Sequence, residues 1–168
     1  MKHLFIYLLT CIILISCNDT KEISSINPIN WQERFIDLST KDSLTNGSSY
    51  LSVYSEIYSM TEHRTINLTA TVSLRNISVK DSVFILNADY YNTHGDLIRN
   101  YFKKPIYIKP LETLEIIIDE KDSHGGSGAN FIFDWKTHPN NSEPHFEAVM
   151  ISTSGQQGIS FTTQGIKL

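Results

Sequence analysis

The sequence contains little cysteine, no basic cluster and no apolar run long enough to cross a bilayer, and each shortage excludes a class of protein. Its 168 residues include two cysteines, and 14 lysines and arginines stand against 18 aspartates and glutamates, a net charge of −4. Nucleic acid is excluded as a partner, because binding to its phosphate backbone needs a basic stripe. Electrostatic adhesion to anionic lipid is excluded for the same reason.

The longest apolar run lies at the N-terminus, from Leu4 to Ser16, behind the basic Lys2. As a helix its thirteen residues would span about 20 Å, against about 30 Å for a hydrocarbon core. That length is typical of a secretory signal. The run ends in Leu14-Ile15-Ser16-Cys17, which resembles the lipobox of bacterial lipoproteins, cut just before a cysteine that then carries lipid. An ordinary signal peptide or short anchor with an incidental cysteine is the alternative.

The lipobox reading decides the chemistry of both cysteines. Cys11 leaves with the signal and Cys17 is lipidated, so the mature chain has no thiol for a disulfide, a metal site or a nucleophile. Several acyl chains make such an anchor stable. Asn18 follows the cysteine, where aspartate would retain a lipoprotein at the inner membrane of some Gram-negative bacteria. We therefore expect a lipid-anchored protein of the cell envelope, in the outer membrane of a Gram-negative bacterium.

The segment after the anchor reads as a tether that contains a short helix. Asn30 is a typical N-cap, and Glu33 stands three residues further on. Trp31, Phe35 and Leu38 share one helical face and predict docking on the domain. Trp31 as a ligand-stacking residue is the alternative to packing.

From Ser48 onward apolar residues recur with a period of two, which is typical of half-buried antiparallel strands. The spacing of these short runs predicts an all-β protein, an immunoglobulin-like antiparallel β-sandwich of seven to eight strands. The alternation predicts buried side chains at Leu68, Val72, Leu86, Ile116 and Phe133. The expected organisation is a signal peptide over 1–16, the lipidated cysteine and tether over 17–47, and the sandwich domain over 48–168.

Four stretches of the domain resemble a family of bacterial lipoproteins of unknown function, domain-of-unknown-function family 3124. They are Tyr50 to Tyr58, Leu68 to Asn76, Gly125 to Phe131 and Glu147 to Thr162. Ser52 stands where members often have proline. The resemblance covers about residues 48–168 and implies no activity, substrate or catalytic residue.

The glycine-rich stretch Gly125-Gly126-Ser127-Gly128 lacks the lysine of a phosphate-binding loop and the last glycine of a serine-nucleophile elbow. It therefore predicts a long mobile loop between two strands, with Asn130 bonding the loop backbone. The acidic cluster from Asp119 to His124 lacks the alternation of a calcium loop and predicts a solvated strand end, with weak calcium binding as the alternative. No metal and no cofactor are expected.

Two sets of side chains are candidates for partner binding. Tyr50, Tyr54 and Tyr58 would share one face of a strand, which suits sugar or peptide recognition, although cross-strand packing explains them too. Gln156 and Gln157 stand at the tip of the last turn, where a purely structural turn needs no glutamine.

These observations favour a non-catalytic envelope protein that binds or scaffolds a protein or glycan. The alternative is an envelope hydrolase or metal-dependent enzyme that uses the Gly125 to Asn130 loop, the acidic and histidine residues beside it, and His145. No motif has mechanistic spacing, so no catalytic residue is predicted.

Overall fold

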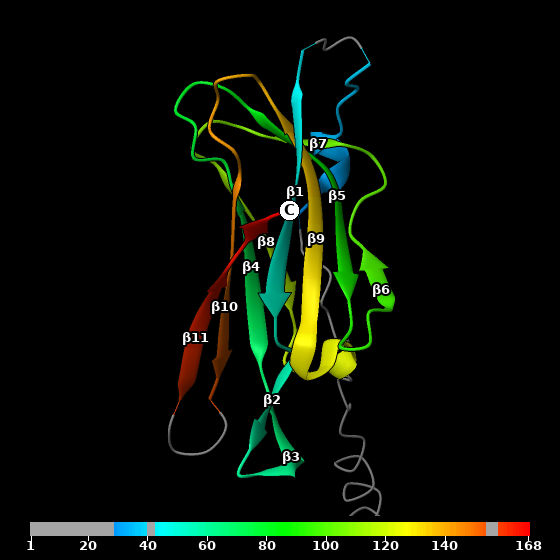
Figure 1. Cartoon of the computed structure of the whole chain (residues 1–168), viewed down its shortest axis with the longest axis vertical. Helices are drawn as coiled ribbons and strands as arrows, with labels where there is room; N and C mark the ends of the chain where they lie inside the picture. Colours follow the sequence, from blue (N-terminus) through cyan, green and yellow to red (C-terminus); the bar gives the residue numbers. More distant parts are fainter. Residues whose placement is uncertain (1–28, 40–42, 154–157) are drawn as a thin grey trace, which may run out of the picture.

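The computed structural model describes residues 29–39, 43–153 and 158–168, and the regular secondary structure of this part is almost entirely β-strand (Figure 1). Two short 3₁₀ helices, η1 (Trp31–Arg34) and η2 (Ser123–Gly128), accompany the strands. The described strands are β1 (Thr45–Val53), β2 (Glu56–Ser59), β3 (Thr61–Asn67), β4 (Thr69–Arg75), β5 (Val83–Tyr91), β6 (Leu97–Asn100), β7 (Ile106–Ile108), β8 (Thr113–Ile118), β9 (Ala129–Thr137), β10 (His145–Ser152), β11 (Ile159–Gln164) and β12 (Ile166–Lys167).

Two antiparallel sheets form the sandwich. The larger sheet has the order β12-β1-β9-β5-β6, with β7 also pairing with β5, and the smaller has the order β11-β10-β4-β8. The chain changes sheets at Gly165, whose N–H donates to the carbonyl of Phe146 at 2.8 Å. The predicted all-β sandwich is confirmed, and its strands outnumber the expected seven to eight because several, such as β2, β7 and β12, are too short to be recognised from periodicity.

The core lies between the two sheets and is rich in stacked aromatic rings. Phe133 on β9 stacks on Phe146 of β10 with 4.2 Å between ring centroids, so this pair joins the sheets. Phe131 stacks on Phe133 at 5.3 Å and on Tyr90 at 4.7 Å. Apolar burial of this kind must stabilise the domain, since the described residues contain no cysteine. Four of the five side chains predicted to be buried are fully buried: Leu68, Val72, Ile116 and Phe133.

The prediction for Leu86 is wrong, because β5 contains a bulge. Ile85 pairs with Trp135 and Asn87 with Asp134, so two steps along β5 match one step along β9. Such a bulge reverses the inward phase of a strand. Val83 and Ile85 therefore belong to the core before the bulge, whereas Leu86 is only half-buried.

β2 and β3 form a separate two-stranded hairpin that extends beyond one end of the sandwich (Figure 1). β3 and β4 are divided at Leu68, whose N–H donates to the carbonyl of Ser55 at 2.8 Å.

Part of the expected tether lies on the sandwich. The Asn30 side chain accepts the N–H of Gln32 at 3.2 Å and donates to Glu33 at 2.8 Å, which confirms the predicted cap. The helix is a single 3₁₀ turn, and Phe35 after it is extended and bridges to Ile106 of β7. No helix among the described residues is long and apolar enough to cross a membrane.

Candidate functional site

The glycine-rich stretch is a packed turn rather than the expected long mobile loop. It forms η2, in which Gly125 is buried and Gly126 has a φ of 71°. The Ser55 N–H donates to the carbonyl of Gly126 at 3.1 Å, from the connection between β1 and β2. Thr93, in the turn between β5 and β6, donates its N–H to Gly125 at 3.0 Å and accepts the N–H of Gly128 at 2.9 Å. η2 is therefore hydrogen-bonded to both the β1–β2 and the β5–β6 connections at this end of the sandwich.

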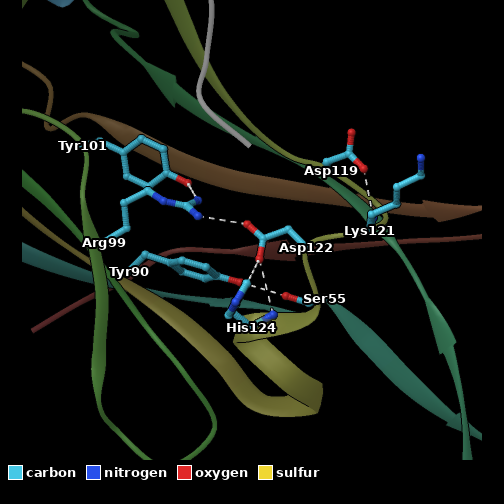
Figure 2. A network of polar contacts seen from close by, with 8 residues as sticks. All are labelled: Ser55, Tyr90, Arg99, Tyr101, Asp119, Lys121, Asp122 and His124. Atoms are coloured by element: carbon cyan, nitrogen blue, oxygen red, sulfur yellow. Dashed lines mark hydrogen bonds and ion pairs between the residues drawn. The ribbon is translucent and has the colours of Figure 1, made fainter. Parts of the chain in front are cut away.

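Asp122, just before η2, is the centre of a buried polar network (Figure 2). Its side chain is 2 % exposed, which corrects the expectation of a solvated strand end. Arg99 of β6 donates to one oxygen of Asp122 at 3.0 Å and, through its other nitrogen, to the Tyr101 hydroxyl at 3.0 Å. The His124 ring lies 2.7 Å from the other Asp122 oxygen. The buried carboxylate is thus charge-paired, as burial of a carboxylate demands.

The geometry of this network suits holding Arg99 in place better than proton transfer. Asp122 orients the His124 ring as a catalytic aspartate orients a histidine, but His124 is 75 % exposed and projects from the turn. Arg99 also holds the same carboxylate. Among the described residues, no group of three or more histidine, cysteine, aspartate or glutamate side chains could hold a metal ion.

A second buried contact lies beside this network, between the hydroxyls of Tyr90 and Ser55 at 2.8 Å. Burial raises the pKa of Tyr90 to about 12, from an ordinary value of 10.0. The folded state therefore disfavours the tyrosinate form.

This raised pKa makes stability depend on alkaline pH. Because the unfolded Tyr90 ionises near pH 10 and the folded one near 12, its contribution is complete below pH 10 and is lost as the pH rises towards 12. We expect a loss of about 2 kcal/mol from this residue across that window. Urea unfolding between pH 9 and 11.5 measures it, and Tyr90→Phe should flatten the dependence. An equally steep loss in Tyr90→Phe would contradict this assignment.

A groove opens next to the Asp122 network, between the N-terminal segment and the β6–β7 connection. Its two adjoining cavities measure about 560 and 290 Å³, and Trp31, Asn100 and Tyr101 line both. Trp31 packs on the buried Phe102 at a centroid distance of 5.2 Å. The remaining lining side chains are Ile29, Asn30, Gln32, Phe35, Arg99, Lys103 and Lys104.

Each wall of this groove is held by an ion pair. Arg34 donates two hydrogen bonds to Glu112, at 2.8 and 3.1 Å, and so ties η1 to the sandwich. These bonds lower the pKa of the Glu112 carboxyl. On the opposite wall, Asp122 holds Arg99 and Arg99 holds Tyr101. The groove is therefore preformed, which reduces the ordering cost of binding.

The three candidate tyrosines do not share one face, so the predicted tyrosine stripe is wrong. β1 ends at Val53, and the Ser55 N–H then donates to the carbonyl of Gly126 in η2. Tyr50 lies on the outer face of β1 opposite Ile132 and Ile166, and Tyr54 packs edge-on against Phe161 at 5.6 Å. Tyr58 lies in the hairpin and is 62 % exposed.

The other predicted residues lie apart from the groove or outside the described part of the chain. Asn130 stands in β9, opposite Ser52 and Tyr91, while backbone groups of η2 make the loop contacts expected of it. Cys17, Gln156 and Gln157 lie outside the described residues.

The sequence interpretation singled out Trp31 but missed its partners from Arg99 to Lys104. The available signal was local: Arg99-Asn100-Tyr101-Phe102-Lys103-Lys104 interleaves aromatic and basic side chains without any strand alternation. That composition favours a surface segment with a role beyond packing.

Comparison with known proteins identifies the family. A comparison with curated proteins gives no match. A solved structure entitled "Crystal Structure of Thermotoga maritima 1070" is 8 % identical, covers 71 % of this chain and 92 % of its own, and has a TM-score of 0.45. A likeness of this size supports no inference about the chain. The family model described as protein of unknown function (DUF3124) matches residues 46–168, almost the whole sandwich and most of the chain. The chain therefore belongs to the DUF3124 family.

Proposed function

We propose that this protein is a lipid-anchored, non-catalytic binding module of the cell envelope, attached to the outer membrane through Cys17. Its partner is a protein or glycan of the envelope. The proposal combines the N-terminal lipobox pattern with the preformed groove beside Trp31 and Tyr101.

The groove is the observation that carries the binding role. The larger of its two cavities is in the size range of small-molecule sites, and both offer aromatic rings together with polar groups. Arg99 and Tyr101 are held in place before any ligand arrives. A surface that only needed solubility would not require a buried carboxylate to position an arginine.

An envelope hydrolase is the second candidate, and the pair Asp122–His124 favours it. A serine or water nucleophile would have to stand within hydrogen-bond reach of the other His124 ring nitrogen. Against this, the Asp122 carboxylate is also paired with Arg99. His124→Ala should therefore leave partner binding unchanged. If the substitution abolished both partner binding and a hydrolytic activity of the wild type, the enzyme would be favoured.

Cys17→Ala tests the anchor. We expect the variant to accumulate as an uncut precursor or in the soluble fraction, because the acyl chains are the source of membrane attachment. Fractionation of inner and outer membranes and mass spectrometry of the N-terminus measure this, with Cys11→Ala as the matched control that keeps normal processing. Processed, membrane-bound Cys17→Ala would contradict lipidation at this residue.

Pull-down from cross-linked native envelope tests the binding role. The full-length wild type should recover a partner, and Trp31→Ala should recover much less, because it removes the aromatic wall shared by both cavities. Tyr58→Ala, a change of an exposed aromatic residue in the distant hairpin, is the control. Equal recovery by the wild type and Trp31→Ala would place the binding surface elsewhere.

A further inference from the structure

The charged side chains that line the groove have one sign, although the carboxylates of Glu33, Asp89 and Asp122 bond to lining residues. Of the described residues that line the two cavities, the charged ones are Arg99, Lys103 and Lys104, all of them cations. The whole chain has a net charge of −4, so this concentration of positive charge is local. Low-dielectric walls strengthen such a field and attract anions.

The three cations differ in how they are held. Arg99 is fixed by Asp122 and lies over the Tyr101 ring, with 5.6 Å from its guanidinium carbon to the ring centroid. Lys104 lies over the Phe35 ring at 5.8 Å. Lys103 is exposed, and neither lysine forms an ion pair with a described residue. The lysines are therefore available to an anionic ligand, whereas the charge of Arg99 is compensated by Asp122.

The remaining lining groups suit sugar rings. Trp31 and Tyr101 are both half-buried, so each ring has a protected side and an accessible one on which an apolar sugar face can stack. Gln32 and Asn100 are exposed amides at the rim, and amides both donate and accept hydrogen bonds as hydroxyl groups require. An extended peptide would instead need a long free strand edge, whereas the edge strand beside these cavities, β6, has four residues and contributes only Arg99 and Asn100 to the lining.

We propose that the groove binds an acidic oligosaccharide, whose ring stacks on Trp31 and whose carboxylate or sulfate groups pair with Lys103 and Lys104. This rests on the proposed binding function and names its ligand class. Arg99 acts as a positioning residue, since it donates to the Tyr101 hydroxyl and so fixes that ring. Neutral glycans lack the charge that this lining complements.

Equilibrium titration of the full chain in detergent micelles tests the proposal with defined probes. The acidic probes are tetragalacturonate, a hyaluronan tetrasaccharide and a heparin tetrasaccharide, and maltotetraose is the neutral one. We expect at least one acidic probe to bind, with affinity falling as salt rises. Trp31→Ala and the double variant Lys103→Ala/Lys104→Ala should each weaken binding by about tenfold, the size of one lost stacking or charge contact.

Matched variants separate binding from folding. Trp31→Phe should recover part of the affinity, because it keeps an aromatic plate. Lys80→Ala/Lys167→Ala removes the same charge from exposed lysines outside the groove and should leave the affinity within about twofold, the effect expected of distant surface charges. Thermal unfolding of every variant checks that the sandwich is intact.

Three results would overturn the proposal: no acidic probe binds, binding is equal in the groove variants, or tetraglutamate binds as tightly as the acidic sugars. Preferential binding to phosphatidylglycerol vesicles would overturn it too and assign the cations to lipid headgroups. If the saccharides fail while Trp31→Ala still loses its partner in the envelope pull-down, the binding function stands and only the ligand class is wrong. If both fail, the proposed function fails as well.

Discussion

Phe133→Ala is expected to lower the free energy of unfolding by about 3–5 kcal/mol, the range for removing a fully buried phenylalanine ring. Phe133 is inaccessible to solvent and lies in the stack between Phe131 and Phe146, so its loss opens a cavity where the two sheets meet. Against typical domain stabilities of about 5–15 kcal/mol, the change would unfold a large share of molecules. Urea unfolding followed by near-ultraviolet circular dichroism measures it.

Leu86→Ala is the matched control for this core substitution. Sequence alternation alone makes Leu86 a core residue. The bulge in β5 instead leaves it half-buried, at a surface cavity that is separate from the groove beside Trp31. Its truncation should therefore cost less than about 2 kcal/mol, below the range for fully buried leucines. A larger loss for Leu86→Ala than for Phe133→Ala would mean that the register of β5 is wrong.

Gly125→Ala is expected to destabilise the domain by about 1–3 kcal/mol, the cost of forcing a methyl group into a filled site. A Cβ atom there would overlap the Tyr90 and Ser55 hydroxyls and come within 2.9 Å of the Ala129 Cβ. The substitution should also weaken ligand binding, because η2 begins directly after Asp122, which positions Arg99. Thermal unfolding and saccharide titration of the same variant measure both effects.

Gly158→Ala provides the comparison, since its nearest neighbour would be the Ser152 carbonyl at an ordinary 3.7 Å. We expect a change within about 0.5 kcal/mol, as for most surface substitutions. Equal stability of Gly125→Ala and the wild type would show that η2 accommodates the added methyl group without strain. That result would contradict the structural role given to the glycine-rich turn.

Strand periodicity predicted the sandwich well, because half-buried strands place apolar residues at every second position. Leu68, Val72, Ile116 and Phe133 were found in this way and are all buried. The same rule failed at Leu86, which continues the alternation of Ala88 and Tyr90, because Val83 to Leu86 are apolar without interruption and hide the change of phase. A bulge depends on the partner strand and leaves no local mark in such a run.

The tyrosine face could not be judged from spacing for a similar reason. Tyr50 and Tyr58 are separated by Ser55, whose backbone bonds Gly126 and whose side chain bonds Tyr90, both distant in sequence. At these contacts β1 has ended, and the chain continues into the β2–β3 hairpin. Intrinsic strand preference over this stretch gives no warning of the break.

The groove was even less accessible to sequence analysis. Trp31 is separated by about seventy residues from the segment that forms the facing wall, and only the docking of η1 brings them together. Asp122, in the connection between β8 and η2, likewise pairs with Arg99 of β6, which is distant in sequence. Local composition suggested a solvated acidic cluster, whereas tertiary packing buries one of its members.

The most direct test of this account uses the two tryptophans of the chain as internal reporters. Trp31 lines the groove, whereas the Trp135 indole is buried and donates to Ser49 at 3.0 Å. The indole N–H signals in ¹H–¹⁵N spectra of the full chain, titrated with the acidic tetrasaccharide that binds most tightly, report each site separately. Binding in the groove predicts that the Trp31 signal moves to saturation while the Trp135 signal stays fixed and the saccharide stays intact. A fixed Trp31 signal, or cleavage of the saccharide during the titration, would contradict the assignment of this protein as a non-catalytic binding module.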